Sequence, residues 1–255
     1  MIKYSVLTYN IDGYEIIHNI PEECMNPEIE YIYVTNDHSI TSNTWTVIYD
    51  DELTGSTFDK CYQIRFNPFK YAHTDVVMRI DGSMAINKDV MPLFQRFEEG
   101  DYDCAMMIHP TRDNMYDEYV AWVNTRNYPA DQANKCLNFM AANGYDVQNY
   151  KGLFQYNFTI QRNNNIINRL NAETYQVLKM LATGTDTAER LDQTIGTFVI
   201  HTHYPNLKVM PVGQYICFDH YFNWCMHGTD QVMAYNCAYD CDPYMFNKAT
   251  TIWYV

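Results

Sequence analysis

A mostly apolar run of strand length ends on an acidic residue, and this acid is the first candidate for chemistry. Residues Val76–Ile80 are followed directly by Asp81, Gly82 and Ser83. In an open α/β sheet, ligands bind beyond the carboxyl ends of the strands, where a carboxylate can meet a metal ion or a sugar hydroxyl. An Asp-Gly pair is also a common turn between the two strands of a hairpin, so this segment alone leaves both interpretations open.

Further polar residues follow other predicted strands. They are Asn10, Asn36, Asp37 and His109. Each of them alone is typical of a turn or a helix cap. Because the carboxyl ends of parallel strands meet at one edge of a sheet, we expect these side chains and Asp81 to gather there. The sequence therefore predicts a polar ligand site at that edge.

The elements that position these residues are short apolar runs that alternate with helical patterns. The predicted strands are Lys3–Tyr9, Tyr31–Thr35, Trp45–Tyr49, Val76–Ile80, Cys104–Ile108, Phe158–Gln161 and Leu207–Val212. The predicted helices are Ser56–Ile64, Lys88–Glu98, Met115–Val123, Ala130–Ala142, Ile166–Met180 and Thr187–Ile200. This alternation predicts an α/β fold with a mainly parallel, Rossmann-type sheet and helices on both faces. The 255 residues contain no repeat and no linker, so we expect a single domain over residues 1–255.

Composition narrows the range of partners. A formal net charge of −14 argues against nucleic acid, because phosphate backbones select basic surfaces. No apolar stretch approaches the roughly 20 residues that span a bilayer, and the first residues lack the pattern of a signal peptide. We therefore expect a cytoplasmic protein whose eight cysteines are mostly reduced.

Three common motifs are missing from the sequence. The dinucleotide fingerprint Gly-x-Gly-x-x-Gly and the P-loop are absent, which disfavours a dinucleotide oxidoreductase and a P-loop NTPase. The absence of Gly-x-Ser-x-Gly disfavours the usual hydrolase elbow.

The last part of the chain is rich in cysteine and histidine. Cys217, Cys225, Cys237, Cys241 and His227 offer thiolate and imidazole ligands that could hold zinc. Their spacing matches no common zinc module, and buried free thiols are the alternative interpretation.

Five segments, in this order along the chain, carry a resemblance to a known family. They are Tyr31–Asp37 with Trp45, Phe66–Tyr71, Arg79–Ser83, His109–Arg112 with Glu118, and Arg190–Gln193. With them the chain resembles the glycosyltransferase-like family that was once catalogued only as a domain of unknown function, with plant cell-wall members and bacterial relatives in surface-polysaccharide loci. The resemblance covers roughly residues 1–200, and the combination of Asn67-Pro68 with Asp81-Gly82 is its most specific part.

The resemblance implies a GT-A-type transferase. Such an enzyme would move a sugar from a nucleoside-diphosphate sugar, for example a UDP-sugar, to a glycan or lipid-linked acceptor in surface polysaccharide synthesis. Residues 1–110 would bind the donor, and residues 111–255 would form the acceptor half with the C-terminal tail. The implied donor-binding residues are Tyr9, Asn10, Asn36, Asp37, Arg65, Lys70, Asp81, Gly82, Ser83, His109 and Arg112.

A divalent cation, Mn²⁺ or Mg²⁺, belongs to this picture because oxygen-bound cations stabilise the charge of a leaving diphosphate. The implied metal ligands are Asp81, Ser83, and a late histidine, His220 or His227. Ser83 stands where the family pattern Asp-x-Asp has its second acid, so the chain lacks one expected carboxylate ligand. For either histidine, a purely structural role is the favoured alternative interpretation.

The resemblance also implies catalytic residues. Asp192 and Gln193 would face the sugar, with Asp192 as base, nucleophile or hydroxyl anchor. An acid near the start of a helix is also common for electrostatic reasons alone. Arg79 is a further cation in this acidic chain, and inside its predicted strand it either reaches the diphosphate or faces solvent.

Two other classes of function remain open at this point. One is a catalytically inactive glycan-binding module on the same fold, which the Ser83 departure favours. The other is a metal-assisted hydrolase that uses Asp81, His109, Asp192 and the late histidine and cysteine residues.

Overall fold

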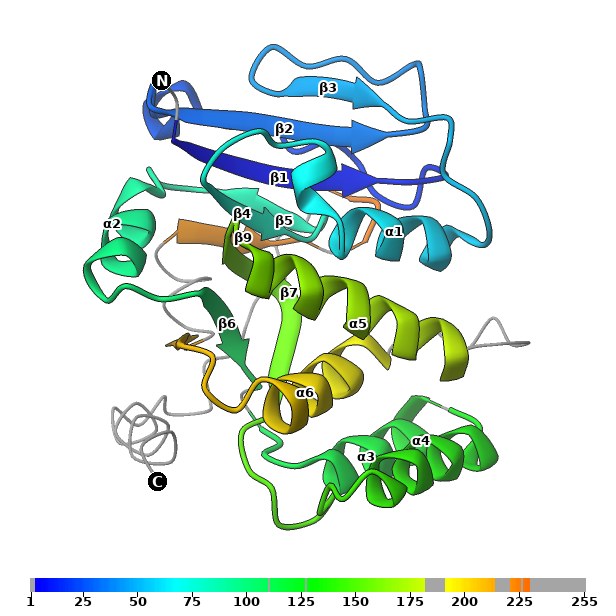
Figure 1. Ribbon diagram of the computed structural model, residues 1–255. Helices are drawn as coiled ribbons and strands as arrows, with labels where there is room; N and C mark the ends of the chain where they lie inside the picture. The colour runs from blue at the N-terminus through cyan, green and yellow to red at the C-terminus, as the bar shows by residue number, and fades with distance from the viewer. Residues whose placement is uncertain are drawn as a thin grey trace.

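A seven-stranded sheet with the strand order β3-β2-β1-β4-β7-β6-β8 is the centre of the protein (Figure 1). The computed structural model describes residues 3–109, 111–126, 128–181, 191–213, 221–225 and 227–229. The strands of the large sheet are β1 (Tyr4–Asn10), β2 (Ile29–Thr35), β3 (Thr46–Tyr49), β4 (Val76–Ile80), β6 (Cys104–Ile108), β7 (Phe154–Arg162) and β8 (Val209–Val212). A separate two-stranded sheet pairs β5 (Met84–Ile86) with β9 (Phe222–Trp224).

The order of the strands creates a switch point between β1 and β4. Strands β2 and β3 follow β1 to one side, whereas β4 lies on its other side, and all these neighbours pair in parallel. Strand β7 is antiparallel to β4 and β6, and β8 is parallel to β6. Ligands of open α/β sheets bind in the crevice beyond the carboxyl ends of the strands at such a reversal.

Helices cover both faces of the large sheet (Figure 1). The α-helices are α1 (Thr57–Arg65), α2 (Met91–Glu99), α3 (Met115–Arg126), α4 (Ala130–Ala142), α5 (Asn165–Leu181) and α6 (Leu191–His203), and two 3₁₀ turns are η1 (Glu22–Cys24) and η2 (Pro68–Lys70). One face packs against α2 and the β5–β9 pair in a common apolar core. The other face packs against α1 near β1 and against α3 to α6 near β6 and β7. The predicted single-domain α/β class, with its mainly parallel Rossmann-type sheet, is confirmed.

Most predicted elements are present with small shifts at their ends. The largest difference is β7, which runs over Phe154–Arg162 where the sequence predicts only Phe158–Gln161. The short strands β5 and β9 are not predicted, because three residues are too few to display alternation. The start predicted for the helix at Thr187 lies outside the described residues.

The described residues also bear on the expectations about membrane spans and reduced cysteines. No helix in the described part of the chain is long and apolar enough to cross a bilayer. Cys24, Cys61, Cys104 and Cys136 carry free thiols, which agrees with the expectation of reduced cysteines.

Local signals set both ends of α1. Ser56 Oγ accepts a hydrogen bond from the backbone N–H of Asp59 at 3.2 Å, and Asp59 Oδ2 accepts one from the backbone N–H of Ser56 at 3.1 Å. This reciprocal capping box starts the helix. Pro68 cannot continue a helix, and α1 ends just before it, with Arg65 in its last turn.

Gly196 gives the first prediction, because it allows α6 to approach β7. A Cβ at position 196 would overlap the ring and the hydroxyl group of Tyr156. Helix propensity alone favours Ala over Gly by about 1 kcal/mol, but forcing extra atoms into a packed core costs about 1–3 kcal/mol. We expect Gly196→Ala to lower the free energy of unfolding, measured by urea denaturation.

The matched control is the double variant Gly196→Ala/Tyr156→Leu, which removes the ring that the new methyl group meets. The two single effects should add up to more than the effect of the double variant, because the two sites are in contact. A Gly196→Ala protein as stable as the wild type would contradict this account of the packing.

Candidate functional site

Four of the predicted site residues meet beyond the carboxyl ends of β1 and β4. Tyr9 belongs to β1, and Asp81 follows β4 directly. Arg65 stands in the last turn of α1, and Asp192 lies in the first turn of α6. Two strands and two helices from distant parts of the sequence therefore converge at the switch point.

Arg65 connects the other three members of this group. Its Nη2 donates to Asp81 Oδ1 at 2.8 Å, and its Nε donates to the Tyr9 hydroxyl at 3.0 Å. Its Nη1 forms an ion pair with Asp192 Oδ2. Burial acts to lower the pKa of Arg65, but Asp81 and the neighbouring tyrosine hydroxyls together raise it above its usual value. Arg65 is thus a permanent positive charge shared by two carboxylates.

Tyr9 is the uncharged member of the group. Burial raises the pKa of its hydroxyl above the usual range, so the group keeps its proton at neutral pH. The hydroxyl oxygen lies 3.5 Å from Asp81 Oδ1, so this proton is directed toward the carboxylate.

A second arginine holds Asp81 from within the sheet. Arg79 precedes Asp81 by two residues, so both side chains point to the same face. Arg79 Nη1 donates to Asp81 Oδ1 at 2.7 Å, and Nη2 donates to the backbone carbonyl of Tyr156. The Arg79 side chain is only 2% exposed, so the alternative that it faces solvent is wrong. Burial, and next the charge of Arg65, lowers the pKa of Arg79.

An irregularity in β7 supplies backbone oxygens to the site. Thr159 lies opposite Met106 of β6, but Gln155 lies opposite Met107, so the pairing shifts between them. In the intervening residues, the carbonyl of Asn157 accepts from the backbone N–H of Asp81 at 2.9 Å. The Tyr156 carbonyl, which accepts from the buried arginine, lies in the same segment. Bulges of this kind redirect backbone and side chains next to functional sites.

Gly82 and Ser83 shape the turn after Asp81. A Cβ at Gly82 would lie 2.6 Å from the backbone oxygen of Tyr9, so only glycine allows this approach of the turn to β1. Ser83 is buried, and its carbonyl accepts from the backbone N–H of Cys225 at 2.8 Å. The expected Asp-Gly turn is present, because the Asp81 carbonyl accepts from the backbone N–H of Met84 at 2.9 Å. It leads into β5, which pairs with β9 in a separate sheet, so the turn does not close a hairpin and Asp81 lies at the sheet edge.

Asn10 and His227 meet at Glu15, a residue that the sequence analysis missed. Asn10 Oδ1 accepts from the backbone N–H of Glu15 at 2.8 Å, and Asn10 Nδ2 donates to the Glu15 carbonyl. The Glu15 carboxylate accepts from the backbone N–H of Gly228 at 3.0 Å and lies 2.5 Å from His227 Nδ1. Asn10 thus orders the loop after β1, and Glu15 joins that loop to residues 227–228. A single glutamate in a loop belongs to no motif and to no periodic pattern that could have revealed it.

A second polar cluster adjoins the start of α6. Glu118 is fully buried; it forms an ion pair with Arg112, and its Oε1 accepts from Gln193 Nε2 at 3.2 Å. His109 Nε2 lies 3.5 Å from Glu118 Oε2. Because Gln193 is the neighbour of Asp192 in the chain, this cluster helps to hold Asp192 in place.

The surroundings of His109 disfavour a charged ring. Its Nδ1 accepts from the backbone N–H groups of Thr111 and Arg112, at 3.3 and 3.0 Å, and Arg112 Nη2 lies 2.8 Å from Nε2. Burial, and next the charge of Arg112, lowers the pKa of His109 to about 3. The ring is therefore neutral at pH 7.

Three predicted donor-binding residues form other contacts. Asn36 Nδ2 donates to Asp12 Oδ1 at 2.7 Å. The hydrogen bond from the Ser39 hydroxyl to Asp37 Oδ1 at 2.6 Å, and next the bond from the Ser39 backbone N–H at 2.9 Å, lower the pKa of Asp37. Lys70 Nζ lies 2.5 Å from Asp50 Oδ2 at the end of β3. These contacts stabilise the loops beside the switch point.

The side chains near Asp81 decide whether the expected divalent cation could bind there. Within the described ranges, no three His, Cys, Asp or Glu side chains are grouped so that they could hold a metal ion. Two guanidinium groups occupy Asp81 Oδ1, and Ser83 provides no charge. His227 is paired with Glu15. In this arrangement the side chains do not fit a divalent cation.

Other parts of the metal predictions fall outside the described residues. These parts are His220, Cys217, Cys237 and Cys241. Mn²⁺, Mg²⁺ and zinc therefore stay predictions.

Comparisons with known proteins add little to this description of the site. No protein-family model matches the sequence, and no curated protein matches it. Among solved structures, the apo form of mouse xyloside xylosyltransferase 1 is similar over 83% of this chain and 85% of that chain, with a TM-score of 0.47 and 10% sequence identity. We therefore base the functional proposal on the site itself.

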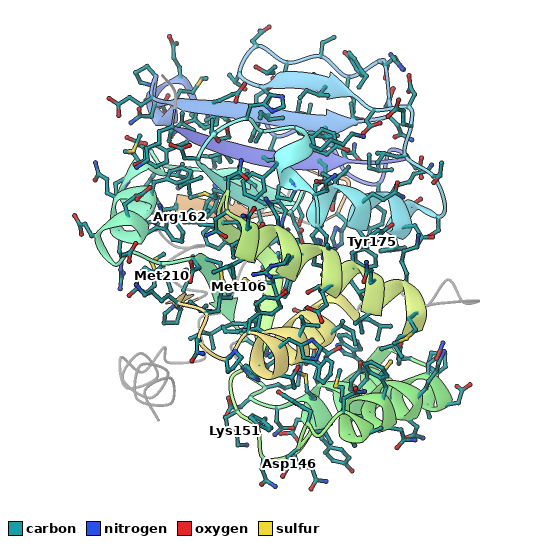
Figure 2. All side chains as sticks on the ribbon, viewed as in Figure 1. Met106, Asp146, Lys151, Arg162, Tyr175 and Met210 are labelled. Atoms are coloured by element: carbon teal, nitrogen blue, oxygen red, sulfur yellow. The ribbon has the colours of Figure 1, made fainter. Side chains whose placement is uncertain are left out.

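The buried arginine gives a prediction on stability. Removing one partner of a buried ion pair costs about 3–5 kcal/mol, but in Arg79→Met the Asp81 carboxylate keeps its contact with Arg65. We therefore expect a loss of about 2–3 kcal/mol in the free energy of unfolding, measured by urea denaturation. The control is Arg162→Met, at the opposite end of β7, where a half-exposed pair with Glu98 should contribute less than about 1 kcal/mol (Figure 2). Equal losses in both variants would mean that Arg79 has no special role.

The neutral imidazole gives a prediction on pH. His109 takes up a proton near pH 3 when folded but near its usual value of about 6.5 when unfolded. The unfolded state therefore binds more protons between these values, and stability falls as the pH falls. We expect His109→Gln to remove about 2 kcal/mol of the stability lost between pH 6.5 and 4.5. Urea denaturation across this range measures it, and His38→Gln, at an exposed histidine, is the control. Parallel pH profiles for wild type and His109→Gln would refute the assignment.

Proposed function

We propose that this protein is a nucleotide-sugar-dependent glycosyltransferase, which moves a sugar from a nucleoside-diphosphate donor to a glycan or lipid-linked acceptor in surface polysaccharide synthesis. The single observation that carries this proposal is the meeting of Asp81, Asp192 and Arg65 at the switch point between β1 and β4. Ligands of α/β sheets bind at this location. The GT-A-type resemblance of the sequence supports the same conclusion.

The charges of the group suit the two ends of a sugar diphosphate. Carboxylates are good acceptors for sugar hydroxyl groups, and a planar guanidinium binds phosphate oxygens with two parallel hydrogen bonds. Arg65 lies between the two carboxylates, so a donor that places its phosphates on Arg65 brings its sugar beside Asp81 and Asp192. We assign Arg65 to the diphosphate and the two aspartates to the sugar.

Gln193 and Glu118 have a supporting part in this proposal. Gln193 donates to the fully buried Glu118. No residue of α6 after Gln193 belongs to the proposed site. Gln193 is accordingly a positioning residue for Asp192 in our assignment, whereas the sequence resemblance implies a catalytic residue. His109 and Arg112 bind the same glutamate and belong to the same support.

The hydrolase alternative has less support. It needs His109 beside Asp81, whereas the described ring contacts of His109 are with Thr111, Arg112 and Glu118. The glycan-binding alternative shares the fold and differs only in the absence of turnover, so the same experiment decides it.

A donor screen tests the proposed function. UDP-, GDP- and CDP-sugars are incubated with the protein and a mixture of oligosaccharide acceptors, and mass spectrometry measures transfer and release of the nucleotide. A bound donor should also raise the unfolding temperature by mass action. Stabilisation by oligosaccharide alone, without any turnover, would identify a binding module and refute the enzyme.

Two variants test the roles that we assign to the carboxylates of Asp81 and Asp192. We expect Asp81→Asn and Asp192→Asn to lower turnover about 100-fold or more, because each removes a charge that faces the reacting sugar, in proteins that circular dichroism shows to be folded. Asp101→Asn is the matched control, because Asp101 is exposed and pairs with Lys208 far from the switch point. Wild-type turnover in either site variant would remove that residue from the mechanism.

A further inference from the structure

We propose that Arg65 takes over the task of a divalent cation at this site: its guanidinium binds the donor diphosphate directly, and donor binding needs no metal ion. This inference rests on the proposed glycosyltransferase function. It concerns how this chain neutralises the leaving group, and it departs from the metal dependence that the sequence resemblance implies.

The first step in the argument is the occupation of Asp81. A cation site at the end of β4 would need this carboxylate as its principal ligand. Its Oδ1 accepts from Arg65 at 2.8 Å and from Arg79 at 2.7 Å. A divalent cation on Asp81 would lie close to the positive charges of Arg65 and Arg79, and like charges repel one another.

The second step concerns the other groups that a metal would use. Position 83 carries a buried serine, so one acid of the usual pair is missing. The late histidine that the structure describes, His227, is 2.5 Å from Glu15. Glu15 in turn accepts from the backbone N–H of Gly228, so both groups already have partners. The negative charges of the site are matched by arginines without a metal ion.

The third step is the difference between the two arginines. Arg79 is 2% exposed and fixed on both sides, by Asp81 and by the Tyr156 carbonyl. Arg65 is 13% exposed and stands at the end of a helix. If Arg65 turns its guanidinium toward a phosphate, Asp81 keeps its ion pair with Arg79. The Asp81 carboxylate therefore keeps a counter-charge during this movement, and the carboxylate that gives up its ion pair with Arg65 is Asp192.

The transfer of the sugar can be written with the groups of this site and without a metal ion. The bond between the anomeric carbon and the phosphate oxygen breaks, and its electron pair stays on the departing diphosphate. A new bond forms from the acceptor hydroxyl oxygen to the anomeric carbon, and the hydroxyl proton passes to the carboxylate of Asp192. Arg65 donates hydrogen bonds to the diphosphate oxygens as their charge grows, which is the interaction that guanidinium groups form best.

Isothermal titration calorimetry of the wild-type protein with UDP, GDP and CDP tests this inference. Each titration is made with EDTA, with 1 mM Mn²⁺ and with 1 mM Mg²⁺. We expect one nucleoside diphosphate to bind in EDTA with a dissociation constant within about threefold of its value with metal. Binding that needs Mn²⁺ or Mg²⁺, or that tightens tenfold or more with either, overturns the inference and leaves the proposed function standing. Absence of binding under all three conditions overturns both.

Variants of the two arginines complete the test in EDTA. We expect Arg65→Gln to weaken nucleotide binding about tenfold or more and Arg65→Lys to weaken it less, because Lys keeps the charge but loses the paired hydrogen bonds. Arg162→Gln is the control, since Arg162 lies on the α2 side of the view, whereas α1 lies on the opposite side (Figures 1 and 2). Circular dichroism verifies that each variant is folded. Unchanged binding by a folded Arg65→Gln protein overturns the inference.

Discussion

Two guanidinium groups removed from water must be matched by negative charge close by, and this requirement shapes the centre of the protein. Arg79 lies inside the sheet, and its charge is compensated by Asp81 at the end of the same strand. Arg65 arrives from a helix and needs a second carboxylate, which α6 supplies through Asp192. Two positive and two negative groups therefore balance within one small volume. In the function proposed above, the same carboxylates face the donor sugar, so one set of charges serves both the fold and the proposed site.

The rest of the scaffold follows from the need to hold these four charges. The capping box and Pro68 fix the ends of α1 so that its last turn reaches the switch point. The irregular pairing of β7 turns backbone carbonyls toward Asp81 and Arg79. The cluster around Glu118 lies beside the first turn of α6 and restrains it through Gln193. Each support comes from a different element, so changes in any of them reach the site through packing.

The sequence was informative where a residue follows a regular pattern. Apolar alternation located the strands, and the residue after an apolar run, Asp81, is at the sheet edge because the carboxyl ends of parallel strands share it. Asp192 was found through the family resemblance of the segment Arg190–Gln193. The position of Asp81 depends only on local order along the chain, which a sequence displays directly.

Other contacts could not be predicted because they depend on competition between side chains in three dimensions. Arg79 could reach the site or face solvent, and only the packing of β7 decided that it is buried. Lys70 was predicted to bind a phosphate of the donor, but in the folded chain its ammonium group forms an ion pair with Asp50. Glu15, β5 and β9 carry no pattern of their own, and their partners lie far away in the sequence. Contacts of this kind become visible only when the whole topology is known.

The contact between β5 and β9 has a consequence for how the protein folds. The carbonyl of Ser83 accepts a hydrogen bond from the backbone N–H of Cys225, and the Glu15 carboxylate binds residues 227 and 228. These partners follow β8, the last strand of the large sheet, and they lie more than 140 residues further along the chain than the loops beside Asp81. Loop closures over such separations are slow, because chain entropy opposes them. We therefore expect the loops beside Asp81 to order later during folding than contacts between residues that are close in the sequence.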